Sequence, residues 1–346
     1  MMQKEIPIMF CFDKNYVIPA AVAFYSLLEH ANKKYNYVLY VLHSDISAKQ
    51  QKQLEETIKE FKNAKIVFKN MNHRLDEEWK ECYRGDHFSK EVMYKLLVAS
   101  IFPQYDTIIV SDVDVVFLGD ISKSYHFIKE NEDYYIAGVK PIGKVKDYLN
   151  CYKNSWSDEE IEKLGEVCGG YLVMNLKKIR EDNIEDKFMN SIKENSHRLN
   201  QMEQDILNIV CYKHIKHLPL QYIACSYMWD YFKNEKDLHT DSNYSFKEIK
   251  LAMEKPIQLH YATSIKPWKN VDCTKSEIWF EYIVKTPFLK EYLTELPHKI
   301  VLPPERVKES APVIVKKESI IHKILRKLKS ILKRIYRKIF KNAKEK

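Results

Sequence analysis

Asp112 and Asp114 are the residues whose type and spacing most directly suggest chemistry. They flank Val113 and follow the apolar, β-branched run 107–110, a pattern typical of a buried strand. Ligands gather at the carboxyl ends of strands in open α/β sheets, where an i, i+2 acid pair can direct both carboxylates toward one hard cation. A pair of solvated loop acids is the alternative, but the apolar strand before the pair favours a cation site of the kind that a bound diphosphate needs.

Other reactive side chains are less specific when taken one at a time. His260 ends the short apolar run 256–260, where a lone histidine is more commonly structural than a ligand, and Lys266 alone would be an ordinary surface lysine. The seven cysteines are scattered, odd in number and never spaced as C-x-x-C, so we expect reduced thiols in a reducing compartment.

The first third of the chain alternates between runs typical of strands and runs typical of helices. We expect strands at 6–12, 38–42, 64–68 and 107–110, and helices at 18–30, from an N-cap at Ser47 to Phe61, and from Ser89 to a stop at Pro103. Such alternation predicts a parallel sheet with crossover helices.

The remaining part has a different pattern. We expect strands at 136–139, 169–176 and 256–260 and a helix at 204–211, with polar segments between them. Pro303, Pro304 and Pro312 indicate a linker, because proline cannot donate the backbone hydrogen bonds of helices and strands.

Composition and charge exclude several classes of protein. With 346 residues, of which 45% are apolar, the chain can bury a large core, yet no apolar run approaches the roughly 18 residues of a membrane span. We expect no signal peptide and a cytoplasmic location. The formal charge of +8 arises in residues 316–346, which carry a net +11, so the body is nearly neutral and nucleic acid is not an expected partner.

Five motifs, in order, resemble those of the family-eight glycosyltransferases. They are Ile8-Met-Phe-Cys-Phe-Asp-Lys-Asn-Tyr16, Asp112-Val-Asp114, Gly169-Gly-Tyr-Leu-Val-Met-Asn-Leu176, Glu203-Gln-Asp-Ile-Leu-Asn208 and His260-Tyr-Ala-Thr-Ser-Ile-Lys-Pro-Trp268. The resemblance implies an A-type glycosyltransferase fold, that is, an α/β, Rossmann-like nucleotide-sugar-binding domain with a mainly parallel mixed sheet. It also implies a retaining hexosyltransferase that uses a UDP-hexose and Mn²⁺ or Mg²⁺.

The resemblance assigns roles to the metal and diphosphate residues. Asp112, Asp114 and His260 match the family's metal ligands, and carboxylate with imidazole suits manganese better than calcium. Lys266 matches a lysine that contacts the diphosphate, where negative charge grows as the nucleotide departs.

The resemblance also assigns residues to the nucleotide and the sugar. Asp13, Asn15 and Tyr16 match a uracil-binding motif, and Val113 lies between the metal ligands. Around the sugar we expect Lys95, Cys168, Gly169 and Gly170, with Glu203 and Gln204 beside the anomeric carbon.

Two positions depart from the family pattern. Lys95 stands where an arginine is common, so the charge remains but the planar fork of donors is absent. Cys168 stands where many members have an asparagine before the glycine pair, and a thiol is a weak hydrogen-bonding group, so the sugar specificity is open. Cys168 has no neighbouring base in the sequence that would make it a nucleophile.

Two other functions are alternatives to the transferase. A catalytically weakened, membrane-surface glycan-binding protein on the same fold would explain Lys95 and Cys168, but the retention of Asp112, Asp114, His260 and Lys266 speaks against a decayed site. A sugar nucleotidyltransferase would need a glycine-rich phosphate loop near the amino terminus, and no glycine precedes Gly85.

We expect the reaction to be a front-side displacement. Gln204 is a weak nucleophile because its amide oxygen is less basic than a carboxylate, so the diphosphate itself is expected to help remove the acceptor proton. A double displacement through Gln204 or Glu203 is the alternative.

The last segment predicts a membrane-surface helix. We expect a glycosyltransferase domain at 1–300 (nucleotide half 1–115, sugar half 116–300), a linker at 301–318 and a basic amphipathic helix at 319–346. Its isoleucines and leucines recur every three or four residues, with lysine and arginine on the other face. A peripheral position on the inner face of the cytoplasmic membrane, near a lipid-linked acceptor, would follow.

Overall fold

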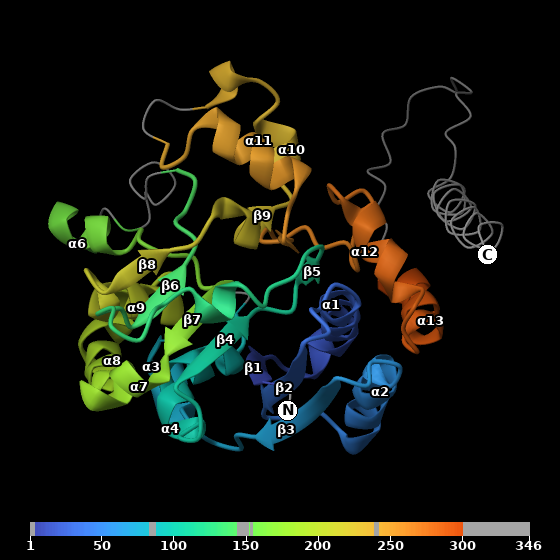
Figure 1. The fold of residues 1–346 in the computed structure, drawn as a ribbon, viewed down its shortest axis with the longest axis horizontal. Coiled ribbons are helices and arrows are strands. Elements are labelled where there is room, and N and C mark those ends of the chain that lie inside the picture. The colour runs from blue at the N-terminus through green and yellow to red at the C-terminus, as the bar shows by residue number, and fades with distance from the viewer. Residues whose placement is uncertain (1–3, 83–87, 144–151, 153–154, 239–241, 300–346) are drawn as a thin grey trace, which may run out of the picture. The chain divides into compact units, whose positions relative to one another are not determined.

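The computed structural model describes residues 4–82, 88–143, 152, 155–238 and 242–299 (Figure 1). The chain divides into two compact units, residues 1–262 and residues 263–346. The predicted helix at 319–346 and the linker at 301–318 lie outside the described residues. The expected domain limits therefore stay predictions.

The described residues of the first unit form ten strands. They are β1 (Lys4–Cys11), β2 (Tyr35–His43), β3 (Ala64–Asn70), β4 (Thr107–Ser111), β5 (Val115–Phe117), β6 (Ile136–Gly138), β7 (Tyr171–Asn175), β8 (Ile215–His217), β9 (Ala224–Cys225) and β10 (Gln258–His260). Seven of them form one sheet in the order β3-β2-β1-β4-β7-β6-β8, and β5-β10-β9 form a second, small sheet.

The large sheet is mixed and mainly parallel. β3, β2, β1 and β4 run parallel, whereas β7 is antiparallel to both β4 and β6. The prediction of an α/β domain with a mainly parallel mixed sheet is confirmed. The parallel run β3-β2-β1-β4 follows from the alternation of strands and helices in the first third of the chain.

Helices surround the strands of the first unit. They are α1 (Val17–Glu29), α2 (Ala48–Ile58), α3 (Asp76–Cys82), α4 (Val98–Ile101), α6 (Asp158–Lys163), α7 (Leu176–Glu181), α8 (Ile184–Asn195), α9 (Glu203–Cys211), α10 (Met228–Tyr231) and α11 (Phe246–Glu254). Ser47 is the N-cap of α2 as predicted, because the Ser47 hydroxyl and the Gln50 side chain cap each other's backbone N–H groups. It ends at Ile58, three residues before the predicted end.

The two faces of the large sheet carry different parts of the core. On one face Met9, Val38 and Val110 belong to a buried cluster that includes Ile206 and Leu207 of α9. On the other, Phe10 packs against Phe24 of α1 with ring centroids 4.8 Å apart. α1 and α9 therefore cover opposite faces, as the alternation of side chains along a strand requires.

The segment after Ser89 differs from its prediction. Residues Lys90–Leu97 form a 3-10 helix, and only Val98–Ile101 are α-helical. The tighter winding is a local feature that apolar spacing does not reveal, because both kinds of helix bring residues i and i+3 to about the same face.

The second unit contains α12 (Ser276–Ile283) and α13 (Leu289–Lys299). Trp279 of α12 packs against Trp268, with ring centroids 5.9 Å apart, and against Tyr292 of α13, with ring centroids 5.2 Å apart. Among all described residues, no helix is both long and apolar enough to cross a lipid bilayer.

Candidate active site

The acid pair connects β4 to β5. The Asp112 backbone N–H donates to the carbonyl of Gly170 at 3.1 Å, which continues the antiparallel pairing of β4 with β7. Val113 points inward and is 4% exposed, so the acids on either side of it keep their carboxylates together. The side chains of Asp112 and Asp114 are 30% and 14% exposed.

His260 reaches the acid pair from the small sheet. β10 is antiparallel to β5 with His260 opposite Val115, and the Tyr261 N–H donates to the Asp114 carbonyl at 3.0 Å. His260 Nε2 lies 3.1 Å from Asp114 Oδ1 and 3.9 Å from Asp112 Oδ2. One ligand atom from each of the three side chains lies within 4.8 Å of the others, an arrangement that can hold a divalent cation.

Gly170 leaves the space that the His260 ring occupies. A Cβ atom at this position would lie 2.7 Å from His260 Cε1 and 2.9 Å from Nδ1. His260 Nδ1 is buried and makes no hydrogen bond to any described residue, so packing against Gly170 orients the ring. A glycine is therefore needed here for close approach.

We expect Gly170→Ala to lower Mn²⁺ affinity about tenfold, the scale of effects seen when groups that orient metal ligands are changed. Manganese titration followed by electron paramagnetic resonance measures this directly. Gly119→Ala is the control, because its Cβ would come no closer than 3.4 Å to a neighbour. Unchanged affinity in Gly170→Ala would mean that the ring moves aside without cost.

Lys95 connects three parts of the site. Its side chain is 1% exposed, and Nζ donates to Asp112 Oδ1 at 2.8 Å, to Glu203 Oε1 at 2.8 Å and to the Gly169 carbonyl at 3.1 Å. An ammonium group has three protons, so these three protein acceptors account for all of them. Lys95 therefore holds the metal-site acid, the glycine pair and the start of α9 together.

The burial of Lys95 and Glu203 has opposite effects on their pKa values. Burial alone would lower the pKa of Lys95, but the carboxylates of Asp112 and Glu203 outweigh it and raise that pKa, so the ammonium stays charged. Burial raises the pKa of Glu203, and the nearby Lys95 opposes the rise. Glu203 Oε2 is buried without a hydrogen-bond partner among the described residues.

Glu203 and Gln204 lie in the first turn of α9, directly after Met202 in a positive-φ conformation (φ 46°). Gln204 Oε1 accepts a hydrogen bond from the Gly169 N–H at 2.7 Å. The two predicted sugar-site residues thus both contact the glycine pair, either directly or through Lys95.

Asp205 fixes the start of this helix, a role that we did not predict from the sequence. Its Oδ2 accepts from the N–H groups of Asn200 and Gln201 at 2.8 and 2.9 Å, and the Tyr152 hydroxyl donates to Oδ1 at 2.6 Å. Asp205 is part of the fourth motif, so its place beside Glu203 and Gln204 was the sequence feature that could have indicated this role.

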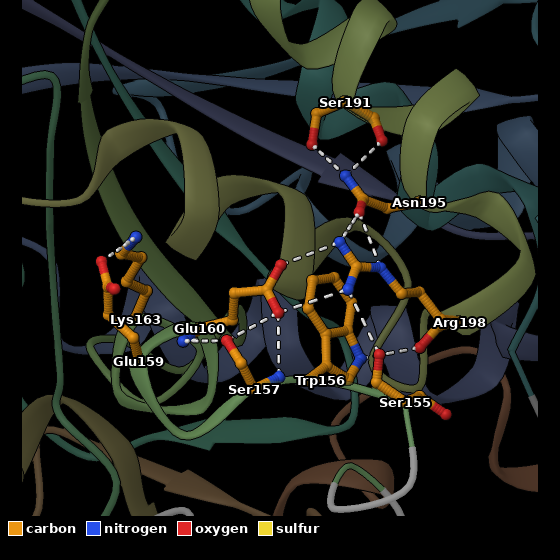
Figure 2. Close-up of polar contacts among 9 residues, drawn as sticks. All are labelled: Ser155, Trp156, Ser157, Glu159, Glu160, Lys163, Ser191, Asn195 and Arg198. Carbon is orange, nitrogen blue, oxygen red and sulfur yellow. Dashed lines mark hydrogen bonds and ion pairs between the residues drawn. The ribbon is translucent and has the colours of Figure 1, made fainter.

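A second polar network supports the segment before α9 (Figure 2). The Arg198 guanidinium lies 3.7 Å from the centroid of the Trp156 ring and donates to Glu160 Oε1 at 3.0 Å and to Asn195 Oδ1 at 2.6 Å. Trp156 in turn donates from its indole N–H to the Arg198 carbonyl at 3.0 Å. The network joins the α6 region to α8 and so steadies the turn that leads to Glu203.

Tyr16, in the segment that follows β1, lies within electrostatic reach of the acid pair. Asp13 accepts from the backbone N–H and the side-chain amide of Asn15 at 2.9 and 2.8 Å. Tyr16 is half-buried, and burial raises its pKa to about 12, with further contributions from the charges of Asp114, Asp13 and Asp112. Their role in uracil recognition stays a prediction.

Cys168 is half-buried beside the glycine pair. Its N–H donates to the Val139 carbonyl at 2.8 Å, and burial raises the pKa of its thiol, so the group is protonated rather than a nucleophilic thiolate.

Lys266 belongs to the second unit, where its Nζ lies 5.9 Å from the centroid of the Trp268 ring and its carbonyl accepts from the N–H groups of Lys269 and Asn270. The predicted contact of Lys266 with the diphosphate stays a prediction.

Comparison with known proteins agrees with this geometry. The family model "Glycosyl transferase family 8" matches residues 7–272. Glycosyltransferase GlyA of Streptococcus pneumoniae is 26% identical over 245 residues, covering 70% of this chain and 30% of GlyA. The lipopolysaccharide 1,2-glucosyltransferase of Escherichia coli is 22% identical over 270 residues, covering 74% of this chain and 71% of that protein.

Among solved structures, galactosyltransferase LgtC in complex with donor and acceptor sugar analogs superposes with a TM-score of 0.62 at 18% identity, covering 82% of this chain and 96% of LgtC. This likeness concerns the fold. The chain spans only about a third of the length of GlyA, so the whole activity of that longer protein cannot be transferred to it.

Proposed function

Because the chain belongs to glycosyl transferase family 8, we propose that it transfers glucose or galactose from a UDP-sugar to a glycan or lipid-linked acceptor, with retention of configuration. Family membership makes it a glycosyltransferase with an A-type α/β fold. The convergence of Asp112, Asp114 and His260 at the end of β4 carries the proposal.

The comparisons support surface-glycan synthesis as the setting. One relative is a lipopolysaccharide glucosyltransferase, and the similar fold of LgtC is that of a galactosyltransferase. We therefore propose lipopolysaccharide, lipooligosaccharide or another surface glycan as the product class.

The residues present fit Mn²⁺. Two carboxylates and one imidazole form a mixed oxygen and nitrogen donor set that manganese accepts, and magnesium is the alternative. When bound, the cation would neutralise the diphosphate of the donor. Asp112 would offer Oδ2, because Lys95 already donates to Oδ1.

The protein's own groups suggest how the sugar is handled. Glu203 Oε2 is a buried acceptor with no described partner, which suits it to a sugar hydroxyl. Gln204 Oε1 already accepts from the Gly169 N–H, and an amide oxygen is a poor nucleophile, so we favour front-side displacement over a covalent adduct. In our proposal Lys266 faces the departing diphosphate, whose oxygens take the acceptor proton.

Hydrolysis of a panel of nucleotide sugars by the purified protein with Mn²⁺ tests this function without the acceptor. We expect UDP-glucose or UDP-galactose to be cleaved and other nucleotides to be spared. Binding of UDP-sugar without cleavage, and without transfer to any glycan, would instead favour the glycan-binding alternative.

We expect Cys168→Asn to change the ratio of turnover between UDP-glucose and UDP-galactose. An amide donates and accepts well where the protonated thiol does neither, and a buried contact to one sugar hydroxyl discriminates strongly between epimers. Kcat/KM for each donor measures the ratio. Cys211→Ser is the control, since Cys211 is buried in the core. An unchanged ratio would show that Cys168 does not face the sugar.

We propose that residues 319–346 bind an anionic membrane surface. Each lysine or arginine near an anionic leaflet contributes about 1 kcal/mol, and the apolar stripe adds to this. Deleting residues 316–346 should abolish sedimentation with anionic vesicles and leave UDP-sugar hydrolysis nearly unchanged. Equal vesicle binding by the truncated and full-length chains would contradict this.

A further inference from the structure

A cavity of about 530 Å³ lies in the first unit away from the candidate active site. Its lining includes Asn32, Tyr35, Lys123, His126, Phe127 and Lys129. We propose that this cavity binds a phosphorylated saccharide. None of the residues assigned to the donor or the metal lines it.

The cavity and the metal-ligand cluster lie at opposite ends of the parallel strands of the large sheet. Tyr35 is the first residue of β2 and pairs with Lys4, the first residue of β1, whereas Asp112 follows the carboxyl end of β4. β1 has eight residues, so seven steps of about 3.3 Å separate the two ends of the strands by roughly 23 Å. One hexose cannot span this distance, so the occupant is not the reacting sugar.

The three lysines of the lining outnumber the two acids beside it, Glu132 and Asp120, of which Asp120 accepts from the Ser122 hydroxyl of the lining at 2.8 Å. Lys129 Nζ donates to the His126 carbonyl at 3.1 Å, which holds this lysine at the rim. Lys216, also in the lining, donates to the Phe127 carbonyl at 3.0 Å and to both carboxylate oxygens of Glu132 at 2.6 Å, so its charge is compensated. Lys123 is exposed and has no ion pair with a described residue. Lys123 and Lys129 therefore supply the net positive charge.

The pKa of His126 agrees with a local excess of positive charge. Its pKa is lowered first by burial and then by the charges of Lys4 and Lys129, and no acid contributes in the other direction. A site in which cations gather around a neutral imidazole suits a phosphate group, for which lysine is an effective point-charge partner.

The remaining lining suits a sugar ring. The ring of Tyr35 lies 6.1 Å from that of His126, centroid to centroid, and Phe127 is a third aromatic residue of the lining. Aromatic faces give apolar contact area, and the side-chain NH₂ of Asn32, which has no partner among the described residues, can donate to a sugar hydroxyl. The volume is within the range of about 300–1,000 Å³ found for small-molecule sites.

The test uses glucose 6-phosphate, inorganic phosphate and glucose as probes of the full-length protein. Isothermal titration in the presence of a chelator keeps the candidate metal site from contributing. We expect glucose 6-phosphate to bind with one-to-one stoichiometry and more tightly than phosphate or glucose. Lys123→Gln combined with Lys129→Gln should weaken binding about tenfold, because hydrogen bonds to charged groups are the strong ones.

Two further variants make the result specific. Lys52→Gln combined with Lys59→Gln removes the same charge from two exposed lysines, one in α2 and one directly after it, and should leave binding unchanged. Phe127→Ala should weaken the binding of glucose 6-phosphate and leave that of inorganic phosphate unaltered. Melting temperatures confirm that each variant is folded.

Three results would overturn the proposal. The first is the absence of saturable binding by glucose 6-phosphate, and the second is an equal loss in the two double variants. The third is equal affinity for phosphate and glucose 6-phosphate together with no effect of Phe127→Ala, since the cavity would then recognise only a small anion.

Discussion

Asp114→Asn is expected to lower transferase turnover about 10³-fold while leaving the protein folded, a loss comparable with that of a major transition-state charge contact. Asp114 lies directly before β5, with His260 Nε2 3.1 Å from its carboxylate, and it has no part in the main core cluster. The neutral amide keeps the shape but loses the negative charge that a divalent cation requires. Turnover of UDP-sugar, Mn²⁺ affinity and melting temperature should be measured together.

Asp182→Asn is the matched control for the acid pair. Its side chain is 30% exposed, as is that of Asp112, and it pairs with Lys178 at 2.9 Å, yet it lies outside the candidate site. His260→Ala should weaken Mn²⁺ binding more than it lowers the melting temperature. Full activity of the unmodified enzyme in excess chelator would remove the metal assignment altogether.

Lys95→Met is expected to abolish turnover and to lower the free energy of unfolding by about 3–5 kcal/mol, the cost of removing one partner from a buried ion pair. Without the ammonium, Glu203 and Asp112 lose their common partner, and the Glu203 carboxylate is left buried. Urea denaturation and UDP-sugar hydrolysis measure the two effects. Lys140→Met is the control, because Lys140 pairs with Glu166 but is 29% exposed.

Lys95→Arg separates a positioning role from direct contact with the donor. If the cation contacted the donor, as the arginine of similar enzymes is expected to, this variant would keep its activity. The structure leads us to expect about a 100-fold loss, because a guanidinium does not fit a 1% exposed site whose acceptors surround an ammonium group, and small displacements of reacting groups have effects of this size.

A double variant tests whether the loss of stability comes from the Lys95–Glu203 ion pair. Lys95→Met with Glu203→Gln removes both charges, so it should recover part of the lost stability and none of the activity. Equal stability of Lys95→Met and the unmodified protein would show that the buried ion pair does not form in solution.

The sequence predicted the strands better than their pairing. The runs at 6–12, 38–42, 64–68 and 107–110 became β1 to β4, because long apolar runs bounded by turns are distinctive. β5, β8 and β9 have three residues or fewer, and we did not predict them. Without β5 and its pairing with β10, nothing in the pattern itself brings His260 to Asp114.

The site residues show the same limit. Ordered motifs were needed to select His260, Glu203 and Gln204, since each has a structural explanation when considered alone. Lys95 was expected beside the donor, but its burial and its three acceptors depend on Gly169 and on the start of α9, which are distant in the sequence. Asp205 and Arg198 were not singled out because their effect on the site passes through other residues.

The separation of the candidate metal ligands along the chain has a consequence for folding. His260 and Asp114 are 146 positions apart, and they meet only after β5 and β10 have paired. Closing so long a loop costs conformational entropy that local contacts cannot offset, which makes this pairing a late event. A cation held by these residues would therefore leave the refolding rate unchanged and act instead on the rate at which the completed domain opens.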